Sequence, residues 1–308
     1  MMSDRNENPR GRWVEHRVTA EQAGSTVQDV LLQHLHLSRR MLQRLTRSRG
    51  LLHNRRPAFL GRTVREGDVV SARIAAREEP SLPAVAMELS IAYEDPDLLV
   101  LDKPPHLLVH PVADHHTATL AHGVAHHLSM QGIQAKVRPV HRLDRDTSGL
   151  VLFARSAFAH QHLDRQLRDG RLEREYLAIV VGEMRDQAVT VDAPIGRHRS
   201  NPTLRAVDPG GEPARTHLTV VERLRDATLV RLRLETGRTH QIRVHLQHLG
   251  HPVLGDRQYG GARPGVRRQA LHAAALGFEQ PRTGEAVRVQ SPLPPDLQRL
   301  VEERRSAE

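Results

Sequence analysis

The spacing of apolar residues divides the chain into a short helical part and a longer part rich in strands. Over residues 27–45 apolar side chains recur every three or four positions, as on amphipathic helices, and Ser38 stands where the N-cap of a second helix is expected. A turn-rich run at 53–57 and a strand-like run at 64–70 follow. The pattern therefore predicts a small α/β module near the start of the chain.

After the run 78–83, which contains two prolines and two glutamates, short strands and turns dominate the pattern. Helices are expected near 119–130, 157–169 and 239–249 and after Pro295, and strands at 89–93, 98–101, 150–154, 176–181, 216–221 and 229–234. Because most of these strands follow one another directly, the order favours an α+β fold with a mixed, largely antiparallel sheet over a doubly wound sheet.

The same changes of pattern predict four parts along the chain. These are a disordered leader over 1–14, a module over 15–79, a linker over 80–88 and a larger domain over 89–308. Hydrophobic residues make up 38% of the 308 residues, which is enough for each domain to bury a core.

The balance of charges indicates a polyanionic partner. The chain has 45 basic and 36 acidic residues, and residues 35–65 hold nine arginines and no acid. An uninterrupted positive face suits the phosphates of RNA or DNA, with Arg39 and Arg40 as candidate contacts. A surface that is merely soluble is the alternative interpretation.

Composition excludes several classes of site. The chain has no cysteine, which rules out disulfides, thiolate metal sites, iron–sulfur clusters and cysteine nucleophiles. It shows neither a phosphate-binding glycine loop nor a His-Glu-x-x-His pattern, and no metal site is expected. No apolar run is long enough to span a membrane and the start has no apolar signal core, so we expect a cytoplasmic protein without a membrane partner.

Three polar segments carry candidate chemistry, and each also has a purely structural reading. Asp144 lies in a polar turn before a buried strand, where an Asx-turn is the alternative. Tyr176 starts a strand, where a core tyrosine with a satisfied hydroxyl is the alternative. Arg243 lies on a helix that Thr239 is expected to cap, and a basic surface helix is the alternative. The segments are 141–149, 174–178 and 236–245.

Taken together, the three segments resemble the RluA family of pseudouridine synthases. That family carries an HRLD-x-x-TSG segment, a tyrosine in a K/R-x-Y-x-A context and a TGRTHQ-(I/L)-R-x-H segment, all of which this chain matches in the same order. The resemblance runs from about residue 89 to 300, with further matches at 102–104, 109–111, 250–260, 271–273 and 292–294. The N-terminal part is similar to the S-four-type RNA-binding module that precedes the catalytic domain in the RluD branch.

The resemblance implies a catalytic domain with a central cleft and an enzyme that isomerises specific uridines to pseudouridine, in large-subunit ribosomal RNA. The reaction is mass-neutral and involves no oxidation, so no cofactor or metal is expected. Asp144 is the implied essential carboxylate, and Arg243 is its implied partner, which keeps it ionised. Tyr176 is the implied active-site tyrosine, which stacks on uracil or relays a proton if its environment or Arg243 makes it a better base.

The remaining site residues also follow from the resemblance. Arg142 is expected either to fill the space left by a flipped uridine or to contact a phosphate, and both readings stay open. The other residues expected to contact the substrate are His141, Thr147, Arg238 and His240, with Arg39 and Arg40 in the N-terminal module.

The sequence leaves other functions open and departs from the family at two turns. A non-catalytic RNA-binding or ribosome-assembly protein, a base-removing hydrolase and a transfer RNA pseudouridine synthase are the alternatives, and we expect a monomer. His106 and Arg55 stand where relatives of this kind have glycine, so each loop is expected to be affected.

Overall fold

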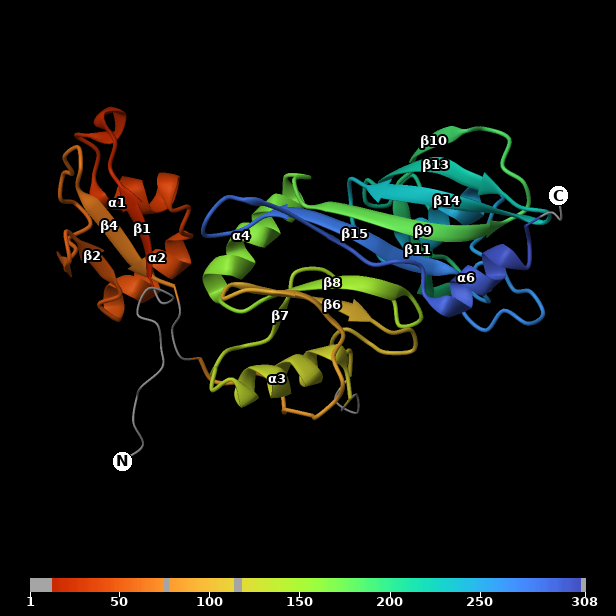
Figure 1. Cartoon of the computed structure of the whole chain (residues 1–308). Coiled ribbons are helices and arrows are strands. Elements are labelled where there is room, and N and C mark those ends of the chain that lie inside the picture. Colours follow the sequence, from red (N-terminus) through yellow and green to blue (C-terminus); the bar gives the residue numbers. More distant parts are fainter. Residues whose placement is uncertain (1–12, 75–77, 114–117, 306–308) are drawn as a thin grey trace.

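The computed structural model describes residues 13–74, 78–113 and 118–305. These residues form a small N-terminal module and a larger domain built around one sheet (Figure 1). Within these ranges no helix is both long and apolar enough to cross a membrane.

The N-terminal module is a four-stranded antiparallel sheet covered by short helices. Its strand order is β1-β4-β2-β3, and its apolar helix faces pack on the sheet as the periodicity predicts. The Ser38 hydroxyl accepts the Met41 N–H at 3.2 Å, which confirms the predicted N-cap. The elements are β1 (Trp13–Arg17), η2 (Ala20–Gln22), α1 (Val27–Asp29), the π-helix η3 (Val30–His34), α2 (Arg39–Arg47), β2 (Leu51–His53), β3 (Arg56–Pro57) and β4 (Val69–Arg73).

Two sequence-based expectations about this module need correction. Because β1 starts at Trp13, the predicted leader over 1–14 was wrong for its last two residues, and its other residues lie outside the described part. Asn54 and Arg55 take φ values of 49° and 64°, the left-handed pair that a two-residue β-hairpin turn requires. Arg55 thus adopts the conformation of the glycine it replaces, and the hairpin between β2 and β3 is kept.

The larger domain confirms the expected α+β fold with a mixed, largely antiparallel sheet. The strand order is β10-β13-β14-β9-β15-β8-β6-β5, with β16 beside β15 and β7 beside β8, and only β15 and β8 pair in parallel. The strands are β5 (Ile91–Glu94), β6 (Leu98–Lys103), β7 (Arg138–Pro139), β8 (Ser148–Ala154), β9 (Glu173–Val181), β10 (Ala188–Asp192), β13 (Arg215–Arg223), β14 (Ala227–Leu234), β15 (Leu271–Glu279) and β16 (Ala286–Gln290).

The parallel junction between β8 and β15 depends on a glycine. Gly149 has a φ of 108°, and a Cβ atom there would lie 2.3 Å from the carbonyl oxygen of Ala273. Only glycine therefore lets the two strands approach. The turn that carries Asp144 comes directly before β8, so this junction places the turn at the middle of the sheet.

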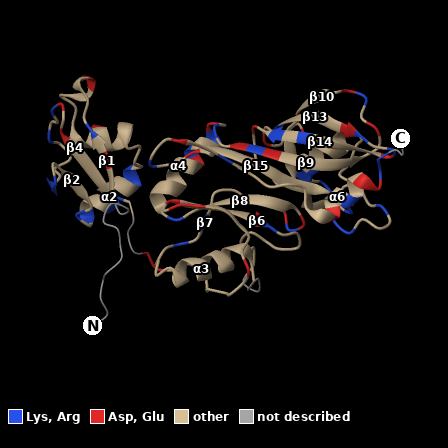
Figure 2. Ribbon diagram, viewed as in Figure 1, with Lys and Arg blue, Asp and Glu red and all other residues tan. Residues whose placement is uncertain are grey.

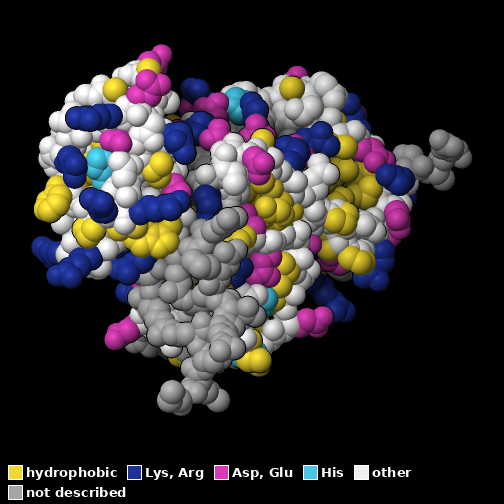
Figure 3. Space-filling model, turned by 60° about the vertical axis from the view of Figure 1, so that its left-hand side comes forward, with side chains coloured by type: hydrophobic (Ala, Val, Ile, Leu, Met, Phe, Trp, Pro, Cys, Tyr) yellow, Lys and Arg dark blue, Asp and Glu magenta, His cyan; other side chains and the backbone are white. Residues whose placement is uncertain are grey.

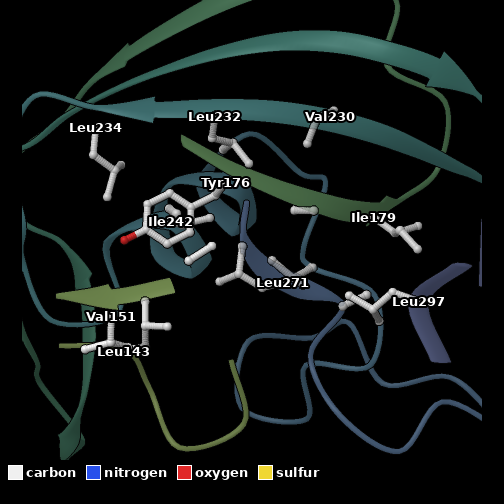
Figure 4. Close-up of a cluster of buried hydrophobic side chains, with 14 of the residues drawn as sticks. Leu143, Val151, Tyr176, Ile179, Val230, Leu232, Leu234, Ile242, Leu271 and Leu297 are labelled. Carbon is white, nitrogen blue, oxygen red and sulfur yellow. The ribbon is translucent and has the colours of Figure 1, made fainter. Parts of the chain in front are cut away.

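Four helices and one separate hairpin complete the domain, and all four helices were predicted. They are α3 (Leu120–Met130), α4 (Ala157–Arg168), α5 (Gln241–His248) and α6 (Pro295–Glu302), and the hairpin is β11 (Ile195–His198) with β12 (Asn201–Val207). Side chains from the sheet and helices α5 and α6, among them Ile179, Val230 and Leu297, form one buried cluster (Figure 4).

The N-terminal module packs on α4, which lies at the near end of the larger domain (Figure 1). Phe158 of α4 is buried in the apolar core of the module. The Ser38 N–H donates to the Gln161 side chain at 2.9 Å, and the His162 ring contacts the Leu35 carbonyl at 3.2 Å. The predicted linker over 80–88 lies along α3, since Leu82 packs on the core there.

Candidate active site

The three segments singled out in the sequence meet in one cavity of about 620 Å³. Its walls are the turn before β8, the start of β9, the end of β14 and the first turns of α5. The predicted residues that line it are Asp144, Tyr176, Arg243, His141, Arg142, Thr147, Arg238 and His240. Arg39 and Arg40 lie on α2 of the N-terminal module, exposed and outside this cavity.

Asp144 presents its carboxylate to the cavity rather than tying down its own turn. The turn is closed by the backbone, because the Thr147 N–H donates to the Asp144 carbonyl at 3.2 Å. The side chain, which is 27% exposed, accepts instead from Nη1 of Arg243, whose distance to Oδ2 is 2.9 Å. Among the described residues none donates a hydrogen bond to Oδ1. The geometry therefore favours the chemical reading of Asp144 over the Asx-turn.

Arg243 is fixed by three further residues that the sequence reasoning did not assign to the site. Asp256 accepts from Nε at 2.6 Å and from Nη2 at 2.9 Å, and Gln258 accepts from Nη2 at 2.6 Å. The ring of Tyr259 lies 4.7 Å from the guanidinium carbon. The signal for these residues was present, because all three lie in or next to the matching segment 250–260.

These partners keep Arg243 charged although it is buried. Burial alone would lower the pKa of Arg243, but the hydrogen bonds with Asp256 and the charges of Asp144 and Asp256 raise it above its ordinary value. The guanidinium is therefore a permanent cation that faces Asp144 with one donor, while its other donors are held by Asp256 and Gln258.

Tyr176 is buried but leaves its hydroxyl free. Its ring packs with Leu234 and Ile242, and its oxygen points away from the side of the cluster that holds Ile179 and Leu297 (Figure 4). No hydrogen bond to this hydroxyl exists within the described residues, which contradicts the reading as a core tyrosine with a satisfied hydroxyl.

The environment of Tyr176 does not make it a base. Burial raises its pKa above the ordinary value, the charge of Arg174 opposes this rise, and the charge of Asp144 adds to it. This environment therefore does not supply the help that a proton relay by Tyr176 would require. A neutral ring suited to stacking is what the structure presents.

His240 is held in place by Tyr259. The Tyr259 hydroxyl accepts the Arg205 backbone N–H at 2.9 Å and shares a hydrogen bond with Nδ1 of His240, 2.8 Å away. Nε2 of His240 lies 4.0 Å from Oδ2 of Asp144. Burial lowers the pKa of His240, which favours the neutral ring.

The start of α5 differs from the expectation. His240, with a left-handed φ of 59°, occupies the N-cap position, and the expected cap Thr239 does not cap the helix. The side chain of Gln241 folds back instead, and its oxygen accepts the Arg238 N–H at 2.9 Å. This conformation directs the His240 ring toward Asp144.

A buried lysine holds the loop that carries Asp144. Nζ of Lys103 donates to the carbonyls of Pro104, Leu107 and Arg145 at 2.8–3.0 Å, and burial lowers its pKa to about 7. His106 takes a φ of 66°, again the conformation of a glycine. The residue that departs from the family at this position therefore has a backbone conformation that glycine adopts without strain.

The other predicted contact residues differ in how much freedom they have. His141 and Thr147 are buried and held in place, since His141 accepts the Leu152 N–H at 3.3 Å and Thr147 accepts from Gln269 at 3.0 Å. Arg142 is exposed at the cavity, and both readings of its role stay open. In the part of the chain that the structure describes, no group of three or more histidines and acids is arranged to hold a metal ion.

The geometry can be compared with known proteins. Residues 97–248 match the family model described as RNA pseudouridylate synthase. The uncharacterized RNA pseudouridine synthase YhcT of Bacillus subtilis is 41% identical over 95% of this chain and 98% of its own length. Ribosomal large subunit pseudouridine synthase D of Vibrio parahaemolyticus is 41% identical over 77% of each chain.

A solved structure agrees with these sequence matches. Human RNA Pseudouridylate Synthase Domain Containing 1 superposes with a TM-score of 0.57 and 30% identity, over 68% of this chain and 85% of that one. Fold, cavity and relatives define an RNA-modifying isomerase. The chain belongs to the RNA pseudouridine synthase family, which confirms the resemblance predicted from the three motifs.

Proposed function

We propose that this enzyme isomerises specific uridines of large-subunit ribosomal RNA, with Asp144 as the catalytic carboxylate and without a cofactor or metal. Relatives named ribosomal large subunit pseudouridine synthase D match at 40–42% identity over about three quarters of the chain, which supports this substrate. The proposal includes the cytoplasmic location and the monomeric state expected from the sequence.

The arrangement of Asp144 carries the proposal. Arg243 holds Oδ2 at 2.9 Å, Oδ1 has no donor among the described residues, and Asp144 lines the cavity. Pseudouridine formation breaks the bond from C1′ of the ribose to N1 of uracil and joins C1′ to C5. The proton leaves C5, and N1 gains one. Oδ1 is placed either to capture C1′ after the base departs or to assist departure, and both roles require the ionised form that Arg243 favours.

The flipped base fits beside Tyr176. A uridine in a helix must leave the stack to reach Asp144, which costs a few kcal/mol. The neutral ring of Tyr176 offers a stacking surface for uracil, and its free hydroxyl offers a hydrogen-bond donor. Nε2 of His240, 4.0 Å from Oδ2 of Asp144, is a further polar contact proposed for the base.

The N-terminal module is proposed to bind the RNA around the target. All nine arginines of residues 35–65 are exposed; basic positions are distributed along the ribbon of this lobe (Figure 2), and basic side chains are spread over its face (Figure 3). Because Phe158 joins the core of the module, deleting the module would also uncover α4. Replacing Arg39 and Arg40 by glutamine is the cleaner test, and we expect weaker RNA binding with a salt slope reduced by about one to two.

Mapping pseudouridine in total RNA tests the proposed substrate. Carbodiimide adducts would be compared between cells that have the gene, lack it, or carry it with Asp144→Asn. We expect specific sites in large-subunit RNA to disappear in both the deletion and the variant. Loss of sites in transfer RNA alone would overturn the ribosomal substrate, and intact sites in the variant would overturn the role of Asp144.

A further inference from the structure

Arg174 is a buried cation in the active-site cavity without a carboxylate partner. It lies on β9 two positions before Tyr176, so both side chains project from the same face of the strand. Its residue exposure is 6%, and its guanidinium makes one hydrogen bond, from Nη2 to the Thr236 carbonyl at 3.1 Å. No ion pair involves Arg174 among the residues that the structure describes.

The other buried arginines of the described chain are paired. They are Arg243, which forks onto Asp256, and Arg268, which donates to both oxygens of Asp296 at 2.7 and 3.0 Å. A buried charge without a partner lowers stability, and proteins normally compensate it. Arg174 therefore differs from the other two buried arginines, each of which has a carboxylate partner.

The surroundings of Arg174 leave its charge uncompensated in the cavity. A Cβ atom at Gly237 would lie 2.7 Å from Nη1 of Arg174, so a side chain there would displace the guanidinium. Two carboxylates line the cavity, and both have other partners: Glu235 pairs with His217 at 2.6 Å and Arg215 at 3.5 Å, and Asp144 accepts from Arg243 at 2.9 Å. The exposed side chains of Arg142 and Arg168 add positive charge at the rim of the same cavity.

We infer that Arg174 and the backbone at Gly237 form a subsite for a phosphodiester of the substrate RNA, next to the nucleotide that enters at Asp144. The ligand must bring a full negative charge to neutralise the guanidinium, which a phosphodiester does and a neutral uracil does not. The planar fork of Arg174 suits two phosphate oxygens. This subsite rests on the proposed function, since it needs RNA in the cavity.

The variant Arg174→Gln tests the subsite, because it removes the charge and keeps a polar side chain. The matched control is Arg233→Gln, which removes the same charge from the exposed face of the neighbouring strand β14. The probe is a transcript of large-subunit ribosomal RNA, whose Kd is measured over a range of salt concentrations. For Arg174→Gln we expect about tenfold weaker binding and a salt slope smaller by about one, with both values unchanged in the control.

Stability separates the subsite from a structural role. Because Arg174 has no carboxylate partner among the described residues, Arg174→Gln should melt at the same temperature as the wild type or higher, and Arg174→Lys should keep the salt slope. A lower melting temperature for Arg174→Gln, or an unchanged Kd and slope, would overturn the subsite. The binding experiment needs no turnover. If Arg174→Gln changes the salt slope but the wild-type enzyme forms no pseudouridine, the proposed reaction is rejected and the subsite is kept.

Uncharged analogues of single phosphates then identify the phosphate that contacts Arg174. In a short stem-loop RNA that carries the mapped uridine, single phosphates next to the target are replaced by methylphosphonates. At one position we expect the methylphosphonate to weaken binding to the wild-type enzyme about tenfold. The same replacement should cause no further loss of affinity for Arg174→Gln, which already lacks the contact. Fully additive losses at every position would contradict a contact between Arg174 and these phosphates.

Discussion

Arg243 and Arg174 are both buried guanidiniums in one cavity, yet they have opposite surroundings. Arg243 donates to two carboxylates and an amide and lies over the Tyr259 ring, whereas Arg174 reaches one backbone carbonyl. A fully paired cation stabilises the fold and fixes the atoms around it, while an unpaired one is available to a ligand. Burial alone therefore does not indicate a residue's role, and the partners of each charge do.

Among the residues that support Asp144, Arg243 should show the largest effect when it is replaced by lysine. A lysine keeps the charge but cannot reach Asp144, Asp256 and Gln258 together, so Asp144 loses its fixed position. We expect pseudouridine formation to fall by about 10³-fold under single-turnover conditions. The matched control is Arg305→Lys, which makes the same change in a surface fork onto Glu222 and should react at the wild-type rate.

A smaller loss is expected for Asp256→Asn, which keeps Arg243 but weakens its support. Asp256 is buried, so removing its charge should lower the free energy of unfolding by about 3 kcal/mol. Displacement of the guanidinium should slow the reaction by about a hundredfold. Asp97→Asn breaks a similar buried fork, onto Arg282, outside the cavity. It should lower stability without changing the rate, and equal rate losses in the two variants would mean that Asp256 acts only through stability.

The smallest effect concerns the pH dependence of stability near Arg174. Burial, and then the charge of Arg174, lowers the pKa of His141 to about 3. The folded state binds a proton at His141 more weakly than the unfolded state does. The contribution of neutral His141 to stability is therefore complete above pH 6.5 and is lost as the pH falls from 6.5 toward 3. In Arg174→Gln the pKa should rise, and the loss of stability between pH 6.5 and 3 should shrink by less than about 1 kcal/mol. Urea unfolding at several pH values would show this, and parallel curves would show that Arg174 does not act on His141.

Much of the fold could be predicted from local patterns. Helix α4 follows a Ser156 cap and has apolar residues at helical spacing, and β14 alternates between Leu232 and Leu234 on one face and arginines on the other. Strand β15 was missed, because its run of small residues is buried on both faces and shows no alternation. Its two unlike neighbours, β9 and β8, are a tertiary feature that a single segment does not encode.

The candidate site, like the fold, could be predicted from the sequence only in part. Asp144, Tyr176 and Arg243 stood in specific motifs, so their meeting in one cavity was predictable. The support from Asp256 was not, because spacing along the chain does not show which way a loop side chain points. The lack of a partner at Arg174 was equally hidden, since it depends on where every carboxylate of the fold lies.

Single-turnover conversion by Asp144→Asn tests the central claim most directly. The amide keeps the shape of the carboxylate but cannot act as an anion or a nucleophile. With purified variant in excess over an RNA that carries the mapped uridine, we predict no detectable pseudouridine and a Kd close to that of the wild type. Substantial conversion by this variant would contradict the assignment of Asp144 as the catalytic carboxylate.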